Sequence, residues 1–141
     1  MPEALINLTE VSDADIDAAC VKIVAESLGR PLGEVALTSV LIDELGAESL
    51  DFLDIVFRLE RDFGIEITRG EMERASRGDM TADEFAPGGV ISEAGLARLR
   101  LLMPEAAERI TPGLRPSTIL TLFSVQTFAN MVRGKRDGRS V

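Results

Sequence analysis

Apolar residues recur at helical spacing in three segments of the chain, and stretches without a regular period separate these segments. The first segment begins at Asp13, and its apolar face consists of Ile16, Cys20, Ile23, Val24 and Leu28. Either Asp13 or Asp15 is expected to cap this helix, and Gly29 followed by Pro31 is expected to end it. Residues 1–12 show no sustained period and are predicted to form a flexible arm.

The segment from Ser49 to Phe63 is the clearest predicted helix, because it contains neither glycine nor proline. Ser49 is a favourable N-cap residue, and Gly64 is a favourable terminator. The face expected to be buried consists of Leu53, Val56, Leu59 and Phe63, with Ile55 beside it. Residues 31–46 ahead of it are predicted to form a long loop held by apolar anchors, which are Val35, Leu37, Val40, Leu41 and Leu45.

The rest of the chain is less regular. Residues 68–116 are rich in Gly, Arg, Pro and Asp, and an evident turn lies at 86–89. Within this stretch, Ser92 is expected to cap a short helix whose apolar face consists of Leu96, Leu99, Leu102 and Met103. Residues 117–133 contain the last predicted helix, capped by Ser124, and the tail at 134–141, which begins with Gly134, is expected to fray.

Composition narrows the possible chemistry. The chain has no histidine and a single cysteine, which argues against a disulfide framework, a His/Cys zinc site and catalysis by a Ser-His or Cys-His pair. That cysteine, Cys20, falls among apolar residues of the first helix, so a buried structural thiol is favoured over a nucleophile. No signal peptide and no apolar run long enough to span a membrane is visible. A single cytoplasmic domain without stable membrane insertion is therefore expected.

The charge is negative and unevenly distributed. Residues 1–67 hold 15 acidic and 4 basic residues, whereas 68–141 hold 9 acidic and 11 basic residues. An acidic first half disfavours nucleic acid and anionic lipid as partners, and it favours proteins with basic patches. Paired acids such as Asp43 and Glu44 lie in this wet, acidic region, where nothing indicates the burial that acid–base catalysis requires. The acid spacing does not match an EF-hand loop, so no metal site is predicted.

Ser49 remains as the candidate for chemistry. A serine ahead of an apolar helix is most often only an N-cap. Here, however, the small residues Gly46 and Ala47 leave the backbone before Ser49 uncrowded, so another enzyme can approach the hydroxyl. The N-terminus of a helix also favours a phosphodiester, because free N–H groups and the helix dipole stabilise negative charge. The residues alone leave both interpretations open.

Residues 41–51 (LIDELGAESLD) resemble the attachment motif of the acyl carrier protein family, in which Asp-Ser-Leu typically follows Leu-Gly-Ala. The following pairs 55–56 and 59–60 and the run 63–67 (FGIEI) fit the same family. The helix that contains 25–29 (AESLG) is similar to the family's first helix, and 124–127 (SVQT) is similar to the start of its last one. The resemblance covers 13–67 and roughly 117–133.

The resemblance implies an all-α fold, a bundle of three main helices plus short helices, and a carrier rather than an enzyme. A phosphopantetheinyl transferase would attach 4′-phosphopantetheine from coenzyme A to Ser49, and the terminal thiol would carry acyl groups as thioesters. The implied surface for acyl-transferring or acyl-modifying enzymes consists of Asp43, Glu44, Glu48, Leu50, Asp51, Asp54, Phe57 and Glu60. The implied pocket for the acyl chain is formed by Leu53, Val56 and Leu59. The family also implies a monomer.

Three departures from the family pattern point to a specialised member. Glu48 stands where the family usually has aspartate, and Arg58 and Arg61 interrupt a helix that is more uniformly acidic in ordinary fatty-acid carriers. Residues 68–116 form an insert between the second and last main helices that is too long for a plain loop. Its apolar helix is expected to pack on the bundle. The alternative, functional interpretation is a docking surface for a partner enzyme or a lid over a bulky acyl chain.

The pathway stays open at this point. Carriage of acyl groups in fatty acid or specialised lipid biosynthesis is the main hypothesis, because the chain is acidic and shows no other domain. The motif does not exclude a carrier of aminoacyl or polyketide intermediates. An unmodified adaptor that keeps the fold and binds through its acidic face is a third hypothesis, from another functional class.

Overall fold

The computed structural model describes residues 7–138, without the side chains of Arg69 and Glu73, and this part of the chain contains helices but no β-strand. The α-helices are α1 (Asp13–Leu28), α2 (Ser49–Phe63), α3 (Arg69–Arg77), α4 (Ala82–Phe85), α5 (Glu93–Leu102) and α6 (Val125–Arg136). Short 3₁₀ segments connect them: η1 (Leu32–Glu34), η2 (Pro87–Gly89), η3 (Pro104–Arg109) and η4 (Pro116–Leu122). The predicted all-α fold is confirmed.

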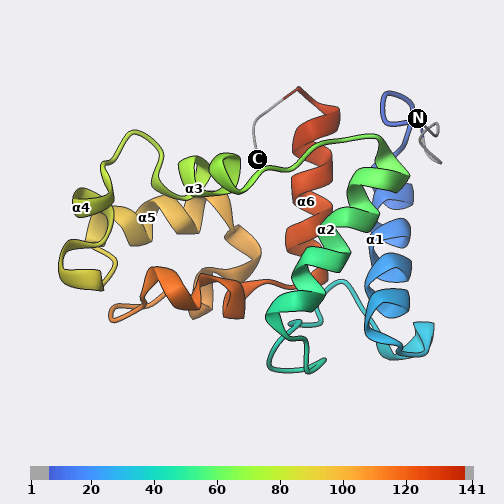
Figure 1. The fold of residues 1–141 in the computed structure, drawn as a ribbon, viewed down its shortest axis with the longest axis horizontal. Helices are drawn as coiled ribbons and strands as arrows, with labels where there is room; N and C mark the ends of the chain where they lie inside the picture. The colour runs from blue at the N-terminus through green and yellow to red at the C-terminus, as the bar shows by residue number, and fades with distance from the viewer. Residues whose placement is uncertain (1–6, 139–141) are drawn as a thin grey trace.

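Helices α1, α2 and α6 stand side by side and form the bundle, with α1 in contact with both of the others (Figure 1). The sequence explains this arrangement, because each helix presents an apolar stripe that is removed from water only when the three faces meet. Ile16 of α1, Leu59 of α2 and Val132 of α6 are all fully buried there. Cys20 is also fully buried, as predicted.

The buried face of α2 differs from the predicted one. Phe52, Ile55, Leu59 and Phe63 are buried, whereas Leu53 is 67% exposed. Successive helical residues are about 100° apart around the axis, so a face that begins at Phe52 places Leu53 on another side. The prediction that Leu53 belongs to the interior is wrong, because α2 carries two apolar stripes and the stripe containing the larger Phe52 is the one that packs.

The helix termini confirm some predicted signals and correct others. Gly29 and Gly64 end α1 and α2 with φ values of 64° and 66°, a left-handed conformation that glycine adopts without steric cost. Helix α1 is capped by Ser12, whose hydroxyl accepts from the Asp15 N–H at 3.2 Å, and not by Asp13 or Asp15. Glu48, and not Ser49, occupies the N-cap position of α2.

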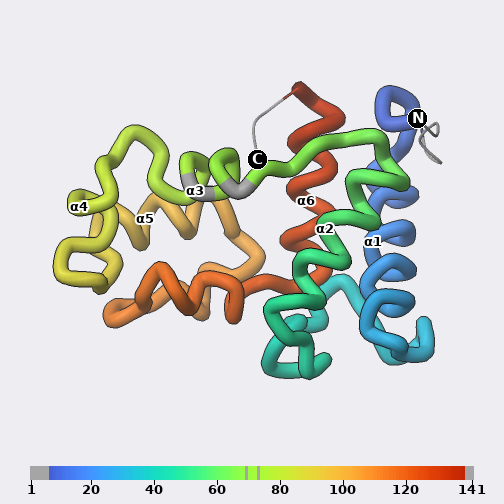
Figure 2. The backbone as a smooth tube through the Cα atoms, viewed as in Figure 1, coloured from blue at the N-terminus to red at the C-terminus, as the bar shows by residue number. Residues whose placement is uncertain are grey.

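The insert forms a second lobe beside the bundle, built from α3, α4, α5 and η3 (Figure 2). Ser92 caps α5 as predicted, by accepting from the Gly95 N–H at 3.1 Å. The buried side of α5 packs mainly on α3 and η3, so the predicted packing on the bundle is replaced by packing within the insert. Two acidic residues of this lobe bind polar side chains of α6. Glu105 accepts hydrogen bonds from Thr127 (2.7 Å) and Asn130 (3.2 Å), and Glu71 pairs with Lys135.

The last helix continues beyond its predicted end. Gly134 lies inside α6, and basic residues of its final turn bind the N-terminal part of the chain. Arg133 pairs with Asp17, and Arg136 pairs with Asp13 at 2.7 Å and donates to the Val11 carbonyl. The prediction of a frayed tail is therefore wrong for 134–138, and 7–12 are held by this contact and by the buried Val11. Residues 1–6 and 139–141 of the predicted arm and tail lie outside the described part.

Replacing Gly95 by alanine is expected to destabilise the insert. A Cβ atom at this position would lie 2.7 Å from Ile91 Cγ2 and 2.9 Å from the Phe85 carbonyl oxygen, so α4 and α5 would have to move apart. We expect the free energy of unfolding to fall by about 1–3 kcal/mol, measured by urea denaturation. Gly134→Ala is the matched control, because nothing lies within 4 Å of a Cβ there and helix propensity favours alanine by about 1 kcal/mol. Equal effects at the two positions would contradict the close approach of α4 and α5.

Cys20 is expected to be unreactive in the folded protein. Burial, followed by the neighbouring negative charge of Asp17, raises the pKa of its thiol to about 12, so the thiolate is scarcely populated near neutral pH. A chromogenic disulfide reagent at pH 8 should react with Cys20 only after the protein is unfolded by urea. Rapid reaction of the native protein would show that α1 opens readily at this position.

Candidate functional site

The loop that leads into α2 is fixed by backbone hydrogen bonds. The Leu41 N–H donates to the Phe123 carbonyl at 3.0 Å, and the Ala47 N–H donates to the Leu41 carbonyl at 2.9 Å. Arg30 donates to the Leu45 carbonyl at 3.0 Å, and Leu45 and Ala47 are buried. These contacts fix the start of α2, although the loop has only one short 3₁₀ turn of its own.

Ser49 is the first residue of α2 and is exposed to solvent. The turn is closed by its neighbours: the Glu48 N–H donates to Asp51 Oδ2 at 2.7 Å, and the Asp51 N–H donates to the Glu48 carbonyl at 2.9 Å. Within the described residues, the Ser49 hydroxyl takes part in no hydrogen bond. Because Ser49 is the first helical residue and not the N-cap, its hydroxyl is left free at a helix end that stabilises negative charge.

Three of the predicted partner-binding acids also hold the backbone around α2. Glu44 accepts from the Val40 N–H at 2.7 Å, and Glu60 accepts from the Ile67 N–H at 2.9 Å. Asp51 accepts from Glu48, as described above. Each carboxylate satisfies a backbone donor at a turn or helix end, which is a structural role that sequence reasoning did not assign.

A fourth acid, Asp54, joins α1 to α2. It accepts from the Ser27 hydroxyl at 2.6 Å and from Arg58 Nε at 2.8 Å, and Arg58 also lies 3.5 Å from Glu26. These hydrogen bonds, from Ser27 first and then from Arg58, lower the pKa of the Asp54 carboxyl. Of the six predicted acids, Asp43, Glu44 and Glu48 are exposed, whereas Asp51, Asp54 and Glu60 are half-buried. Partner binding by these acids stays a prediction.

The exposed side of α2 is markedly apolar. Leu50, Leu53 and Phe57 are 74%, 67% and 61% exposed, and their spacing places them on one face of the helix, which we call the α2 stripe. Leu50 and Phe57 thus lie on the surface, where partner binding requires them. Leu53 joins them there instead of lining a pocket, whereas Val56 is half-buried and Leu59 is fully buried. The neighbouring Phe52 is the sequence signal from which the exposure of Leu53 could have been predicted.

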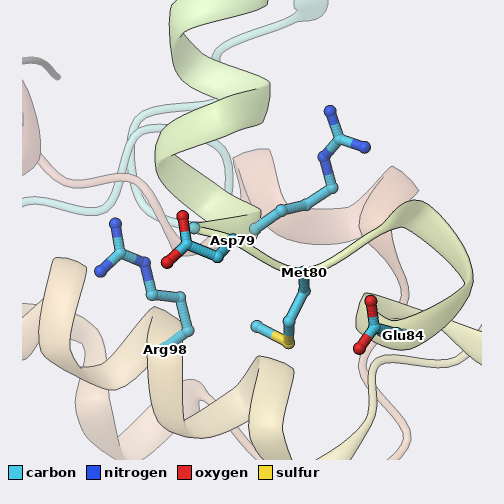
Figure 3. Close-up of a pocket in the computed structure, with 6 residues that line it drawn as sticks. Asp79, Met80, Glu84 and Arg98 are labelled. Carbon is cyan, nitrogen blue, oxygen red and sulfur yellow. The ribbon is translucent and has the colours of Figure 1, made fainter.

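The insert contains a hollow that the sequence did not suggest. It has a volume of about 540 Å³ and lies between α3, α4 and α5, lined by Arg77, Gly78, Asp79, Met80, Glu84 and Arg98. Figure 3 shows side chains of both charges along it, with the Met80 thioether between them. Arg98 is tethered by a hydrogen bond from Nε to the Ala75 carbonyl. None of the residues that line this hollow belongs to the predicted site.

Among the side chains that the structure describes within residues 7–138, no group of histidine, cysteine, aspartate and glutamate has the arrangement of a metal site. No helix in that same part of the chain combines the length and the apolar character needed to cross a membrane.

Comparison with known proteins places these features in a family. Residues 21–81 match the family described as "Phosphopantetheine attachment site", a region that contains the second half of α1, all of α2 and α3, and Ser49. No solved structure matches the chain. Residues 21–81 thus match a type of domain that is the site of covalent 4′-phosphopantetheine attachment, which is consistent with a member of the acyl carrier protein family.

Proposed function

We propose that the chain carries acyl groups as thioesters on 4′-phosphopantetheine attached to Ser49, in fatty acid or specialised lipid biosynthesis, and that it catalyses no reaction itself. The exposed hydroxyl of Ser49, free of hydrogen bonds within the described residues and lying inside the matched region, is the observation that carries this proposal. The arm supplies a thiol, and the chain supplies its point of attachment and the surface beside it.

The position of Ser49 fits its loading by a phosphopantetheinyl transferase. In that reaction the Ser49 hydroxyl gives up its proton and forms an ester bond to the phosphorus that bears the pantetheine. The bond from this phosphorus to the rest of coenzyme A breaks, and adenosine 3′,5′-bisphosphate leaves. The product is a phosphodiester with one negative charge, which the N–H groups and dipole of the first turn of α2 stabilise. The reciprocal hydrogen bonds between Glu48 and Asp51 keep that turn formed.

The α2 stripe is the proposed contact surface for the transferase and for the acyl-transferring enzymes. It begins one residue after Ser49, so an enzyme that receives the arm meets Leu50 first and Leu53 and Phe57 further along. Exposed apolar residues grouped in this way commonly mark a binding surface. Asp43 and Glu48 add negative charge at its N-terminal end, where basic residues of a partner would be attracted.

Loading of Ser49 can be measured directly by intact mass. After incubation with coenzyme A and a broad-specificity transferase, the folded chain should gain the mass of one phosphopantetheine group. Ser49→Ala should show no gain, whereas Ser117→Ala, which replaces an exposed serine outside the matched region, should load like the unmodified sequence. Absence of a gain in the folded wild-type chain would contradict the proposal and favour an unmodified adaptor, whereas a gain in Ser49→Ala would show that the arm is attached to another residue.

Polar substitutions in the α2 stripe are expected to weaken partner binding without affecting the fold. Leu53→Ser and Phe57→Ser should lower kcat/KM for loading by roughly tenfold, because single well-placed apolar side chains often contribute more than 1 kcal/mol to an interface. Both side chains are exposed, so the free energy of unfolding should change by less than about 0.5 kcal/mol. Leu101→Ser is the control, since Leu101 is equally exposed on α5 in the insert. If all three variants load at the same rate, the stripe is not the contact surface.

A further inference from the structure

Three phenylalanine rings form a closed cluster inside the bundle. Phe52 and Phe123 meet edge to face with ring centroids 5.8 Å apart, and Phe123 and Phe128 do the same at 5.5 Å. Phe52 and Phe128 complete the triangle at 6.1 Å. All three side chains are buried. Because each ring contacts both of the others, this aromatic cluster fills the space where α2, α6 and the segment that joins η4 to α6 meet.

The cluster lies within one helical turn of the proposed attachment point, towards the C-terminal end of α2. Phe52 is three residues after Ser49, or roughly 4.5 Å along the helix axis. The buried face of α2 then continues through Ile55 and Leu59 to Phe63. An arm attached at Ser49 that turned towards the interior along this face would therefore pass Phe52 before it brought its acyl chain to Leu59.

The Phe123 ring cannot move aside easily, because hydrogen bonds hold the backbone on both sides of this residue. The Phe123 carbonyl accepts from the Leu41 N–H at 3.0 Å, and the Val125 N–H donates to the Ser39 carbonyl at 3.1 Å. On the other side, Arg109 of η3 donates to the Leu122 carbonyl at 2.8 Å. Displacing Phe123 would break contacts to the loop before α2 and to the insert at the same time. The end of the insert thus holds the ring in place.

From these observations we propose that the aromatic cluster closes the bundle to a straight acyl chain, so that this carrier keeps its acyl group outside the core. The inference rests on the proposed attachment at Ser49 and goes beyond it, because it assigns Phe52 and Phe123 as the residues that determine where the acyl chain lies. It also assigns a role to the insert, whose Arg109 anchors the backbone next to Phe123. The thioester of this carrier then stays accessible to water and to partner enzymes whatever the length of the acyl chain.

The test compares the accessibility of thioesters of different chain lengths. The chain is loaded from acetyl- and octanoyl-coenzyme A, and the rate of thioester cleavage by hydroxylamine is measured relative to free acetyl- and octanoyl-pantetheine. In the wild-type chain the two relative rates should be equal, and the methyl NMR signal of the buried Ile55 should not shift when octanoyl replaces acetyl. In Phe52→Ala, cleavage of the octanoyl thioester should slow about tenfold, equivalent to about 1.4 kcal/mol in favour of the buried chain. The Ile55 signal should then shift.

The control is Leu101→Ala, which shortens an exposed side chain of α5 outside the α2 stripe and should behave like the wild type. Phe52→Leu provides a milder opening if Phe52→Ala does not fold. Protection of the octanoyl thioester in the wild-type chain, or no protection in a folded Phe52 variant, would overturn the inference. Loading is read separately as the gain in mass. A folded chain that never gains mass contradicts the proposed attachment, whereas a loaded chain that buries octanoyl contradicts only the closed bundle.

Discussion

The pairing of the loop before α2 with the segment before α6 is the constraint on which the rest of the structure depends. Val40 and Ser124 form an isolated antiparallel bridge, and Leu41, Val125 and the Gln126 N–H take part in backbone hydrogen bonds across the same junction. Two segments more than eighty residues apart are thereby held together. This junction fixes the start of α2 and the start of α6, and the side chains on both helices pack from these fixed points.

The acidic residues in and next to α2 contribute to the stability of the fold as well as to its charge. The sequence presents a strongly acidic first half, yet Glu44, Asp51, Asp54 and Glu60 each accept hydrogen bonds within their own chain. Since Arg58 lies against Asp54 and Glu26, part of the negative charge is neutralised locally. The surface of α2 left for a partner is consequently more apolar than the composition indicates.

Local patterns in the sequence predicted much of this fold, because the relevant signals lie close together along the chain. Gly29 and Gly64 mark real helix ends, Ser92 and Ser124 are real caps, and the run from Ser49 to Phe63 is a helix over its whole length. What periodicity could not decide was the choice between two apolar stripes on α2, which depends on Phe123 and Phe128 from the distant end of the chain. The prediction of a frayed tail is wrong at 134–138 for the same reason, since the partners of Arg133 and Arg136 lie on α1. The attachment motif in the sequence indicates Ser49, and the solvent exposure of Ser49 in the structure adds that its hydroxyl is accessible.

The insert leaves the bundle next to α6 and returns to α6. Glu71 near its beginning pairs with Lys135, and Glu105 near its end binds Thr127 and Asn130. A chain segment whose two ends are anchored on one helix forms a closed loop. The entropy cost of closing such a loop rises only with the logarithm of its length. The number of residues between those anchors can therefore change in evolution at little cost to the bundle. The insert is a place where a carrier can acquire or lose a whole lobe while the helix that begins at Ser49 keeps its position.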